Sequence, residues 1–587
     1  MYEEQDMTHQ NDSNTLTRKT FLMGAGALLG TTSACALTPD TDGIKAAPGR
    51  VRRQRPNILL VMSDQQFGLP DLPGSLDLPG HEALLKKGAS FTNFHVHMTP
   101  CAPSRSTLYT GRHIQQTKVI ANPDNPPYPE LSPDIATVGT YLKARGYQTR
   151  YKGKWHLSTL ADSSEKSLIS ASKSRALEPY GFSQFNEYGD PTGYTWGGLR
   201  HDPGIASDAI SMIEDMRADA DDGTPWFLAV NFVNPHDIMF YDATGEQEQT
   251  RLAQGFISPL KGDPEIGPYK DFLDAPLPAS LMGDDLSTKP QSHRDQLVGL
   301  DYVFGVMERQ DEEAWRRYRN YYFNCVRDLD RSIDLLLRGL KASGQADNTI
   351  VVFCADHGEM AGAHGLRQKL STIYKENLRV PFIVCHPDVN GGFETTALAG
   401  AVDLVPTLLS LAGNGDAGED DAVTLPGLDL SGAIVSASGR TQRDEEGVLF
   451  NNASVYGWDN EFLKQQLNAF ASRDIEAIGR LQKTGPSLQN RVLIRGVHDG
   501  RYKFARYFAP AQHHIPDDWD TLLKYNDLEL YDTINDPDEM VNLAADPDSH
   551  KGEIERLNSM TNALIRREIK DDTGSEYPGP RELYNTV

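Results

Sequence analysis

A lone cysteine, Cys101, precedes a predicted helix at a position that suits reactive chemistry. Pro103 to Thr110 favours a helix, and its proline falls in the first turn, where a missing N–H is not needed. A side chain at this end faces unpaired N–H groups and the positive end of the helix dipole, which favours a nucleophile or an anion. Arg105 lies one turn further along and can reach back over the thiol. A lone cysteine is otherwise a small buried apolar residue, so its neighbours must decide between these interpretations.

Polar residues also gather where predicted strands end. The clusters are Ser63-Asp64-Gln65-Gln66, Asn234-Pro235-His236-Asp237 and Asp356-His357-Gly358-Glu359. Open α/β sheets bind ligands at these carboxyl ends of their strands. Carboxylate and amide oxygens with one imidazole suit a hard divalent cation better than structural zinc. One such cluster alone is usually a turn or a helix cap, but their recurrence together with Cys101 favours a functional site.

These clusters need a frame of strands and helices, which the sequence from Pro56 onward supplies. Short uninterrupted apolar runs, typical of buried parallel strands, alternate with segments of helical spacing. The predicted strands are 57–62, 225–232, 350–354 and 380–385, and the predicted helices are 81–87, 135–145, 318–340 and 404–411. Asp403 is expected to cap the last helix. We expect the α/β fold class, with a large, mostly parallel sheet flanked by helices.

Two regions depart from this alternation. Residues 237–310 are rich in Pro, Gly and Asp and indicate an insertion. Beyond residue 440, His498-Asp499-Gly500 lies between two short apolar runs and predicts a hairpin, and a helix is expected near 551–568. We therefore expect a signal peptide and linker at 1–50, a catalytic domain at 51–440 that contains the insertion, and a smaller α+β C-terminal subdomain at 441–587.

The composition restricts the partners of this 587-residue chain. Its 57 Lys and Arg residues against 82 Asp and Glu residues give a net charge of −25 at pH 7. Nucleic-acid binding is therefore not expected, and an anionic substrate would require basic groups concentrated at one place. The 5 cysteines are widely spaced and predict no disulfide framework. No segment after the N-terminal region is long and apolar enough to be a transmembrane helix.

The N-terminal region has the features of an export signal. A basic pair, Arg18-Lys19, precedes Phe21-Leu22 and the short apolar run 23–29, and small residues follow up to Ala34-Cys35-Ala36. The basic pair resembles a twin-arginine signal with lysine in its second basic position. We expect export to the periplasm, with lipid attachment at Cys35 as an additional hypothesis.

The segment Cys101-Ala102-Pro103-Ser104-Arg105 matches the formylglycine signature of the type I sulfatases, within the alkaline phosphatase superfamily. The resemblance covers most of the mature chain and implies an alkaline-phosphatase-like fold and a sulfuric ester hydrolase. Further segments that are similar to the family, in the same order, are Leu108 to Arg112, Gly146 to Leu157, Pro235-His236, Asp356-His357-Gly358, Arg379-Val380-Pro381 and Glu529 to Asp532.

This resemblance implies a modified nucleophile. A maturation enzyme would oxidise Cys101 to formylglycine (3-oxoalanine), whose hydrate carries two hydroxyl groups. One hydroxyl attacks the sulfate ester, and the other later expels sulfate and regenerates the aldehyde. By the same resemblance, Asp356 accepts the proton of the attacking hydroxyl and Arg105 holds the hydrate.

The resemblance also implies a metal site formed by Asp64, Gln65, residue 101, Asp356 and His357. The pairing of Gln65 with His357 is closer to choline-sulfatase-like bacterial members, and to phosphonate monoester hydrolases, than to many arylsulfatases. Calcium is expected because oxygen ligands dominate. Manganese is the alternative, since imidazole suits softer ions.

The remaining polar residues receive their roles from the family in the same way. Lys154 and Lys369 supply positive charge beside the sulfate, the electrostatic contribution that usually matters most. His236 is the general acid for the leaving oxygen, and His156 removes a proton from the second hydroxyl.

Loops over the scaffold are expected to select the substrate, chiefly within 158–205 and 237–310. The predicted substrate-binding residues are Lys154, Arg200, His201, His236 and Lys369. Tyr188, Tyr194 and Trp196 could stack on sugar rings, with core packing as the alternative. We predict hydrolysis of a sulfate ester, on a carbohydrate. The alternatives are a phosphonate monoester or phosphodiester hydrolase of the same superfamily, and a binding protein that has kept the fold without catalysis.

Overall fold

The computed structural model describes residues 55–123, 129–160, 171–219, 223–253, 260–413, 424–452, 459–574 and 576. Contacts place Gln54–Val587 in one compact unit. The predicted export signal and Cys35 lie outside the described residues. Among those described, no helix combines the length and the hydropathy needed to cross a bilayer.

A seven-stranded sheet forms the centre of this unit, in the order β4-β5-β1-β6-β7-β2-β8. β1 pairs in parallel with both β5 and β6, and β7 pairs antiparallel with β6 and with β2, so the sheet is mostly parallel as predicted. The strands are β1 (Asn57–Asp64), β2 (Ala89–Phe91), β4 (Gln148–Gly153), β5 (Trp226–Pro235), β6 (Thr349–Ala355), β7 (Phe382–Cys385) and β8 (Phe393–Thr395).

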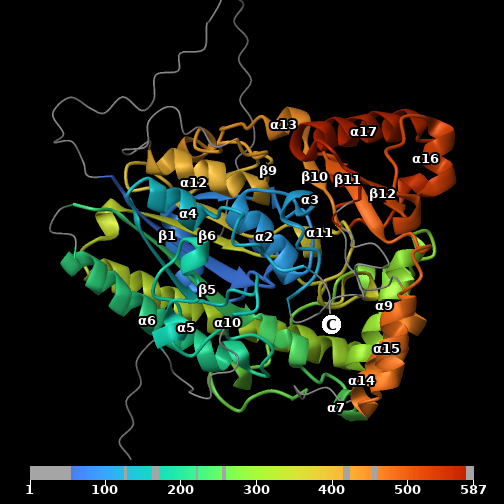
Figure 1. The fold of residues 1–587 in the computed structure, drawn as a ribbon, viewed down its shortest axis with the longest axis horizontal. Helices are drawn as coiled ribbons and strands as arrows, with labels where there is room; N and C mark the ends of the chain where they lie inside the picture. Colours follow the sequence, from blue (N-terminus) through green and yellow to red (C-terminus); the bar gives the residue numbers. More distant parts are fainter. Residues whose placement is uncertain are drawn as a thin grey trace, which may run out of the picture. The chain divides into compact units, whose positions relative to one another are not determined.

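Helices cover both faces of this sheet (Figure 1). Alternate side chains of β1 point to opposite faces, which is why its apolar run is uninterrupted. Leu60 packs in the core formed with α2, α4 and α12, and Leu59 packs in the core formed with α6 and α10. The bounds of these helices are α2 (Cys101–Thr110), α4 (Val138–Ala144), α6 (Gly197–Asp219), α10 (Glu312–Ala342) and α12 (Leu404–Ala412).

The carboxyl ends of four neighbouring strands carry the polar clusters. Asp64 ends β1, Lys154 follows β4, His236 follows β5 and Asp356 follows β6. Since β4, β5, β1 and β6 are consecutive in the sheet and parallel, these residues lie at one edge. This is the edge at which open α/β sheets bind ligands.

One predicted local contact is wrong. Asp403 directly precedes α12, but its side chain does not cap the helix. Its carboxylate instead pairs with the buried guanidinium of Arg443, at 2.6 Å, and accepts the N–H of Leu428. A buried arginine needs an ionic partner more than an N-terminal helix turn needs a cap, because the uncompensated charge is the costlier of the two.

A four-stranded antiparallel sheet, β10-β11-β12-β13, follows in the C-terminal part of the chain. The predicted hairpin is confirmed, since β11 and β12 pair on either side of Asp499 to Arg501. Leu557 and Leu564 of α17 pack on this sheet. The bounds are β10 (Val448–Phe450), β11 (Leu493–His498), β12 (Tyr502–Phe508), β13 (Asp527–Asp532), α16 (Trp519–Tyr525) and α17 (Lys551–Leu564).

The predicted insertion contains short helices, and the remaining elements are small. The insertion includes α7 (Gln247–Ala253), α8 (Ser280–Gly283) and α9 (Gln291–Phe304). Elsewhere the chain forms α1 (Pro79–Lys87), β3 (Phe94–His95), α3 (Ile114–Thr117), α5 (Ala171–Ser174), α11 (Lys375–Leu378), β9 (Ala399–Gly400), α13 (Arg443–Glu446), α14 (Asn460–Ser472) and α15 (Ile475–Thr484).

Candidate active site

Cys101 is the first residue of α2 and is completely buried. The helix therefore starts two residues before the expected Pro103, which keeps the proline in its first turn. The Sγ atom lies 3.2 Å from His357 Nε2, 3.2 Å from Lys369 Nζ and 3.8 Å from Lys154 Nζ. Burial raises the pKa of the thiol, but Lys154, Lys369 and His357 lower it more, so it lies well below its ordinary value. This environment stabilises an anionic nucleophile.

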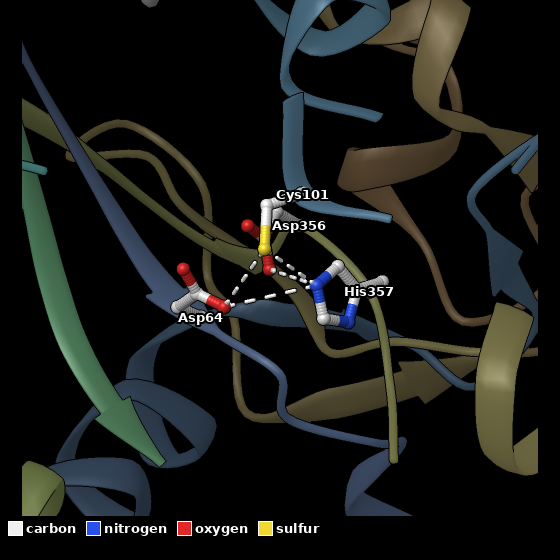
Figure 2. A group of neighbouring side chains, drawn as sticks. All are labelled: Asp64, Cys101, Asp356 and His357. Carbon is white, nitrogen blue, oxygen red and sulfur yellow. Dashed lines mark hydrogen bonds and ion pairs between the residues drawn. The ribbon is translucent and has the colours of Figure 1, made fainter. Parts of the chain in front are cut away.

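Three further side chains converge on Cys101 with atoms that can hold a metal ion (Figure 2). One atom each from Asp64, Cys101, Asp356 and His357 lies within 4.8 Å of the others, and all four residues are buried. The two carboxylates are close enough that burial and Asp64 together raise the pKa of Asp356. Two buried carboxylates beside an imidazole fit a divalent cation, because a cation would offset their repulsion and desolvation.

Gln65 joins this group through its backbone and its amide. Its N–H donates to Asp356 Oδ1 at 3.0 Å, and its Oε1 accepts from Lys369 Nζ at 2.8 Å. The same Lys369 atom contacts Cys101 Sγ, so Lys369 links the amide oxygen of Gln65 to the thiol. The structure thus brings together all five residues of the predicted metal site.

Arg105 holds the predicted metal ligands in place. Its Nε donates to Asp356 Oδ2 at 2.8 Å, and its second terminal nitrogen lies 3.4 Å from Asp64 Oδ2. Another N–H donates to the carbonyl oxygen of Lys154 at 2.9 Å. These contacts are with the carboxylates and with the backbone before Trp155, rather than with Cys101. The guanidinium therefore fixes the carboxylates on which a cation would bind.

Two lysines place positive charge on either side of the thiol. Lys154 forms a buried ion pair with Asp64, and its pKa is raised because Asp64 and Cys101 outweigh the effect of burial. Lys369 reaches the same centre from the loop after β6. Such a pair of cations beside a nucleophile suits a substrate with a compact anionic group.

The two predicted catalytic histidines lie around the same centre. Burial, Lys369 and Lys154 lower the pKa of His236 to about 3. His156 has a left-handed backbone, with φ of 55°, and its N–H donates to Asp190 Oδ2 at 2.7 Å. The side chain of His156 is among the groups that lower the pKa of Cys101, after burial raises it and the lysines lower it. Both imidazoles therefore interact with the Cys101 environment.

Arg200 and His201 are not in direct contact with Cys101 or with the four other predicted metal ligands. Within the described residues, Arg200 lies over the Trp196 ring at 5.8 Å, and His201 stacks on Tyr188 at 5.6 Å. They connect to the site through Asp237, whose carboxylate accepts the N–H groups of Gly198 and Leu199 at 2.9 and 3.1 Å.

Several supporting residues were missed by sequence reasoning. Glu359 is fully buried and accepts from Gln65 Nε2 at 2.5 Å and from the Gln368 N–H at 2.7 Å. Asn231, inside β5, accepts from Arg105 at 3.2 Å. Glu359 had a signal, since it lies within the cluster after β6. Asn231 and Asp190 had none, because their partners Arg105 and His156 are distant in sequence.

A small pocket of about 40 Å³ adjoins Lys369. Part of its lining comes from the predicted insertion, including Gln296, Leu300 and Phe304, and Met239 lies in the same lining. Residues of 237–310 therefore do border the candidate site, on an apolar side.

Comparison with known proteins agrees with this geometry. The family model described as Sulfatase matches residues 56–414. An ulvan-active sulfatase of Formosa agariphila is 29% identical over 71% of this chain and 72% of its own length. A choline-sulfatase of Rhizobium meliloti is 28% identical over 61% and 68%, respectively. A Δ4,5-hexuronate-2-O-sulfatase of Bacteroides thetaiotaomicron is 24% identical over 84% and 86%.

The fold has a solved counterpart as well. The structure of a 2-O GAG sulfatase superposes with a TM-score of 0.61 at 23% identity, over 90% of this chain and 96% of that one. This likeness confirms the predicted fold class. The family match covers most of the described chain and includes every residue around Cys101. The chain therefore belongs to the sulfatase family of sulfuric ester hydrolases.

Proposed function

We propose that this protein hydrolyses a sulfate ester of a carbohydrate, with residue 101 acting as formylglycine. The arrangement of Lys154, Lys369 and the Asp64–Asp356 pair around Cys101 carries the proposal. The lysine cations can bind a sulfate monoester anion, and the buried carboxylates can bind a divalent cation. Both pairs of groups lie beside the same nucleophile. The hexuronate and the ulvan named for two relatives support the carbohydrate class.

Two groups would be added to the chain. Oxidation of Cys101 by a maturation enzyme would supply a hydrated aldehyde whose hydroxyl is the nucleophile. When bound by Asp64, Gln65, residue 101, Asp356 and His357, a divalent cation would supply Lewis-acid polarisation and lower the pKa of that hydroxyl. The oxygen-rich donor set favours calcium, with manganese as the alternative.

The chain's own residues then bind the sulfate and handle protons. Lys154 and Lys369 hold the sulfate oxygens, since their ammonium groups lie on the Cys101 side of the site. Their charge keeps His236 neutral in the free protein, with its pKa lowered to about 3 by burial and by these lysines. A bound sulfate anion offsets that charge, so that His236 can hold the proton that the leaving oxygen needs. Asp356 and His156 accept protons from residue 101.

A second candidate function is hydrolysis of a phosphonate monoester or phosphodiester. It is favoured by Gln65 and His357, which both face Cys101. The same cations would bind a phosphonate anion, so the protein surroundings alone do not separate the two ester types. Relative rates on matched substrates separate them.

The test begins with enzyme co-produced with a maturation enzyme. Mass spectrometry of the peptide around residue 101 is expected to show the aldehyde in place of the thiol. This enzyme should cleave 4-nitrophenyl sulfate and sulfated sugars faster than a 4-nitrophenyl phosphonate monoester, and Cys101→Ala should reduce sulfate release to background. Cys385→Ala, at a half-buried cysteine elsewhere in the sheet, is the matched control and should retain activity. An unmodified thiol in fully active enzyme would contradict the proposal.

A further inference from the structure

The segment between Asp190 and His201 is tied to both proposed catalytic histidines. At one end, the Asp190 carboxylate accepts the N–H groups of Trp155 and His156, at 3.0 and 2.7 Å. At the other end, Asp237, which directly follows His236, accepts the N–H groups of Gly198 and Leu199. The segment therefore bridges the two histidines and borders the site at which they would act.

This segment presents aromatic surface under backbone strain. Trp196 has φ of 56°, a left-handed conformation that is rare for an aromatic residue. Strain of this kind persists where the surroundings hold it, and it clusters at binding sites. Tyr194 is 53% exposed, and the His201 ring lies between those of Tyr188 and Tyr194, at 5.6 and 5.8 Å. An exposed aromatic face of this kind suits the apolar face of a sugar ring.

Arg200 is the charged group on this surface. It is exposed, and its guanidinium lies 5.8 Å over the Trp196 ring. In the part of the chain that the structure describes, no carboxylate lies within ion-pair distance of Arg200. Arg217, further along the same helix α6, instead pairs with Glu214. In a chain with a net charge of −25, an exposed cation on the segment that contacts the backbone beside both histidines favours the binding of an anion.

We propose that Arg200, with the rings of Tyr188, Tyr194 and His201, forms a subsite for an acidic sugar. Arg200 binds an anionic group other than the sulfate being cleaved, on the same sugar unit or the next one. A guanidinium binds planar oxyanions with two parallel hydrogen bonds, and contact with Trp196 limits its motion. The group is a carboxylate or a second sulfate, which share this chemistry. The proposal rests on the proposed function and specifies its substrate class.

The experiment compares three sulfated sugars on the matured, metal-loaded enzyme. They are a sulfated hexose, the corresponding sulfated hexuronate, and a disulfated hexose, so that carboxylate and second sulfate are tested separately. The quantity measured is the ratio of kcat/KM for each acidic sugar to that for the neutral one. Arg200→Ala should lower this ratio about 10-fold, the size of one hydrogen bond to a charged group, through KM rather than kcat. Arg200→Lys should recover part of it, because it restores the charge without the planar pair of donors.

Arg217→Ala is the matched control, an exposed arginine on the same helix α6, and should keep the wild-type ratio. Raising the salt concentration should lower the wild-type ratio, since an exposed ion pair is screened. An unchanged ratio in Arg200→Ala, or an equal fall in Arg217→Ala, would overturn the subsite while leaving the sulfatase function in place. Failure of the wild-type enzyme on every sulfate ester, with turnover of a phosphonate monoester, would overturn the proposed function itself.

Discussion

Three residues around the thiol have left-handed backbones, and each is held by a carboxylate. Gln65, His156 and Gln368 have φ of 70°, 55° and 63°. Their N–H groups donate to Asp356, Asp190 and Glu359, at 3.0, 2.7 and 2.7 Å. Each such conformation costs of order 1–3 kcal/mol in a residue other than glycine. The carboxylates offset that cost and fix the backbone at these three positions.

Replacing Lys154 should impair the reaction more than binding. In Lys154→Ala, the cation that pairs with Asp64 and lies 3.8 Å from Sγ is lost, and kcat/KM should fall about 10²–10³-fold. Steady-state kinetics on 4-nitrophenyl sulfate measures this. Lys152→Ala, two residues earlier on β4 and beside Asp208 and Glu187, is the control and should stay near the wild-type value. A similar fall in both variants would point to strand disruption instead.

Glu359 is expected to act as a positioning residue for Gln65. Its oxygens accept four hydrogen bonds, so a glutamine at 359 would turn an amide NH₂ toward at least one donor. The four donors are Gln65 Nε2, Tyr318 OH and the N–H groups of Ala361 and Gln368. Glu359→Gln should therefore cost about 1–3 kcal/mol of stability and weaken cation binding about 10–100-fold.

The measurement for Glu359→Gln is the Ca²⁺ concentration that half-restores Tm after chelation by EDTA. Wild-type Tm should rise when Ca²⁺ is added back, because binding to the folded state alone stabilises it. Glu313→Gln, on the exposed surface of α10, is the control. A half-restoring concentration equal to that of the wild type would show that Gln65 needs no support from Glu359.

The residue types of the site were largely predictable, but their supports were not. Asp64, Cys101, Asp356 and His357 lie in short motifs at strand ends, so their convergence follows once a parallel sheet is assumed. Asp190 and Asn231 act through contacts that no local pattern marks, since their partners are 34 and 126 residues away. The contacts of Arg105 with Asp356 and Asp64 were not predictable from local sequence either, because they depend on which carboxylates are buried beside it.

At the scale of elements, the end of β4 depends on one glycine. Gly153 has φ of 94°, and a Cβ there would lie 1.8 Å from the carbonyl oxygen of Asn231, which accepts the Lys154 N–H. Gly153→Ala should cost about 3–5 kcal/mol and displace Lys154. Gly245→Ala, at φ of 81° with open space, isolates the backbone strain and should cost about 1–2 kcal/mol. Urea unfolding measures both, and equal losses would rule out the steric explanation.

The elements with strong periodicity were predictable, although α10 begins at Glu312 rather than at the expected Tyr318. β1, β5, β6 and α10 were predicted because their apolar runs are long or regularly spaced. The reversed direction of β7 was not predictable from its residues, since a buried strand looks alike in either direction. The cap expected from Asp403 does not form because its carboxylate pairs with the buried Arg443, 40 residues further along the chain, and no local pattern marks that contact.

At the scale of the whole molecule, a buried histidine joins three segments. His97 Nε2 accepts the N–H of Val402 at 3.1 Å, so its Nδ1 carries the proton and donates to the Leu449 carbonyl at 2.6 Å. Leu449 lies in β10, and Val402 precedes α12. Protonation would remove the acceptor, and burial together with His113 lowers the pKa of His97 to about 3.

Stability is therefore expected to fall as the pH drops from 7 to 5. The unfolded chain takes up a proton at His97 near its ordinary pKa of about 6.5, whereas the folded protein does not until far lower pH. Between pH 7 and pH 5, His97 should lower the free energy of unfolding by about 1–2 kcal/mol, and this loss begins near pH 6.5. His97→Gln should show a smaller fall in unfolding free energy between pH 7 and pH 5, by that amount, in urea titrations. Parallel falls in both proteins would assign the effect to other groups.

Under the proposed function, the complete burial of Cys101 limits when its modification can take place. A maturation enzyme cannot bind a side chain that is enclosed by α2, two lysines and two carboxylates, so it would have to act while the segment is still extended. The proposed oxidation would therefore precede folding, and a chain that folds first would keep its thiol. The active fraction would then depend on the rate of Cys101 oxidation relative to the rate of folding. Slowing translation or supplying more of the maturation enzyme should raise the active fraction without changing the amount of folded protein.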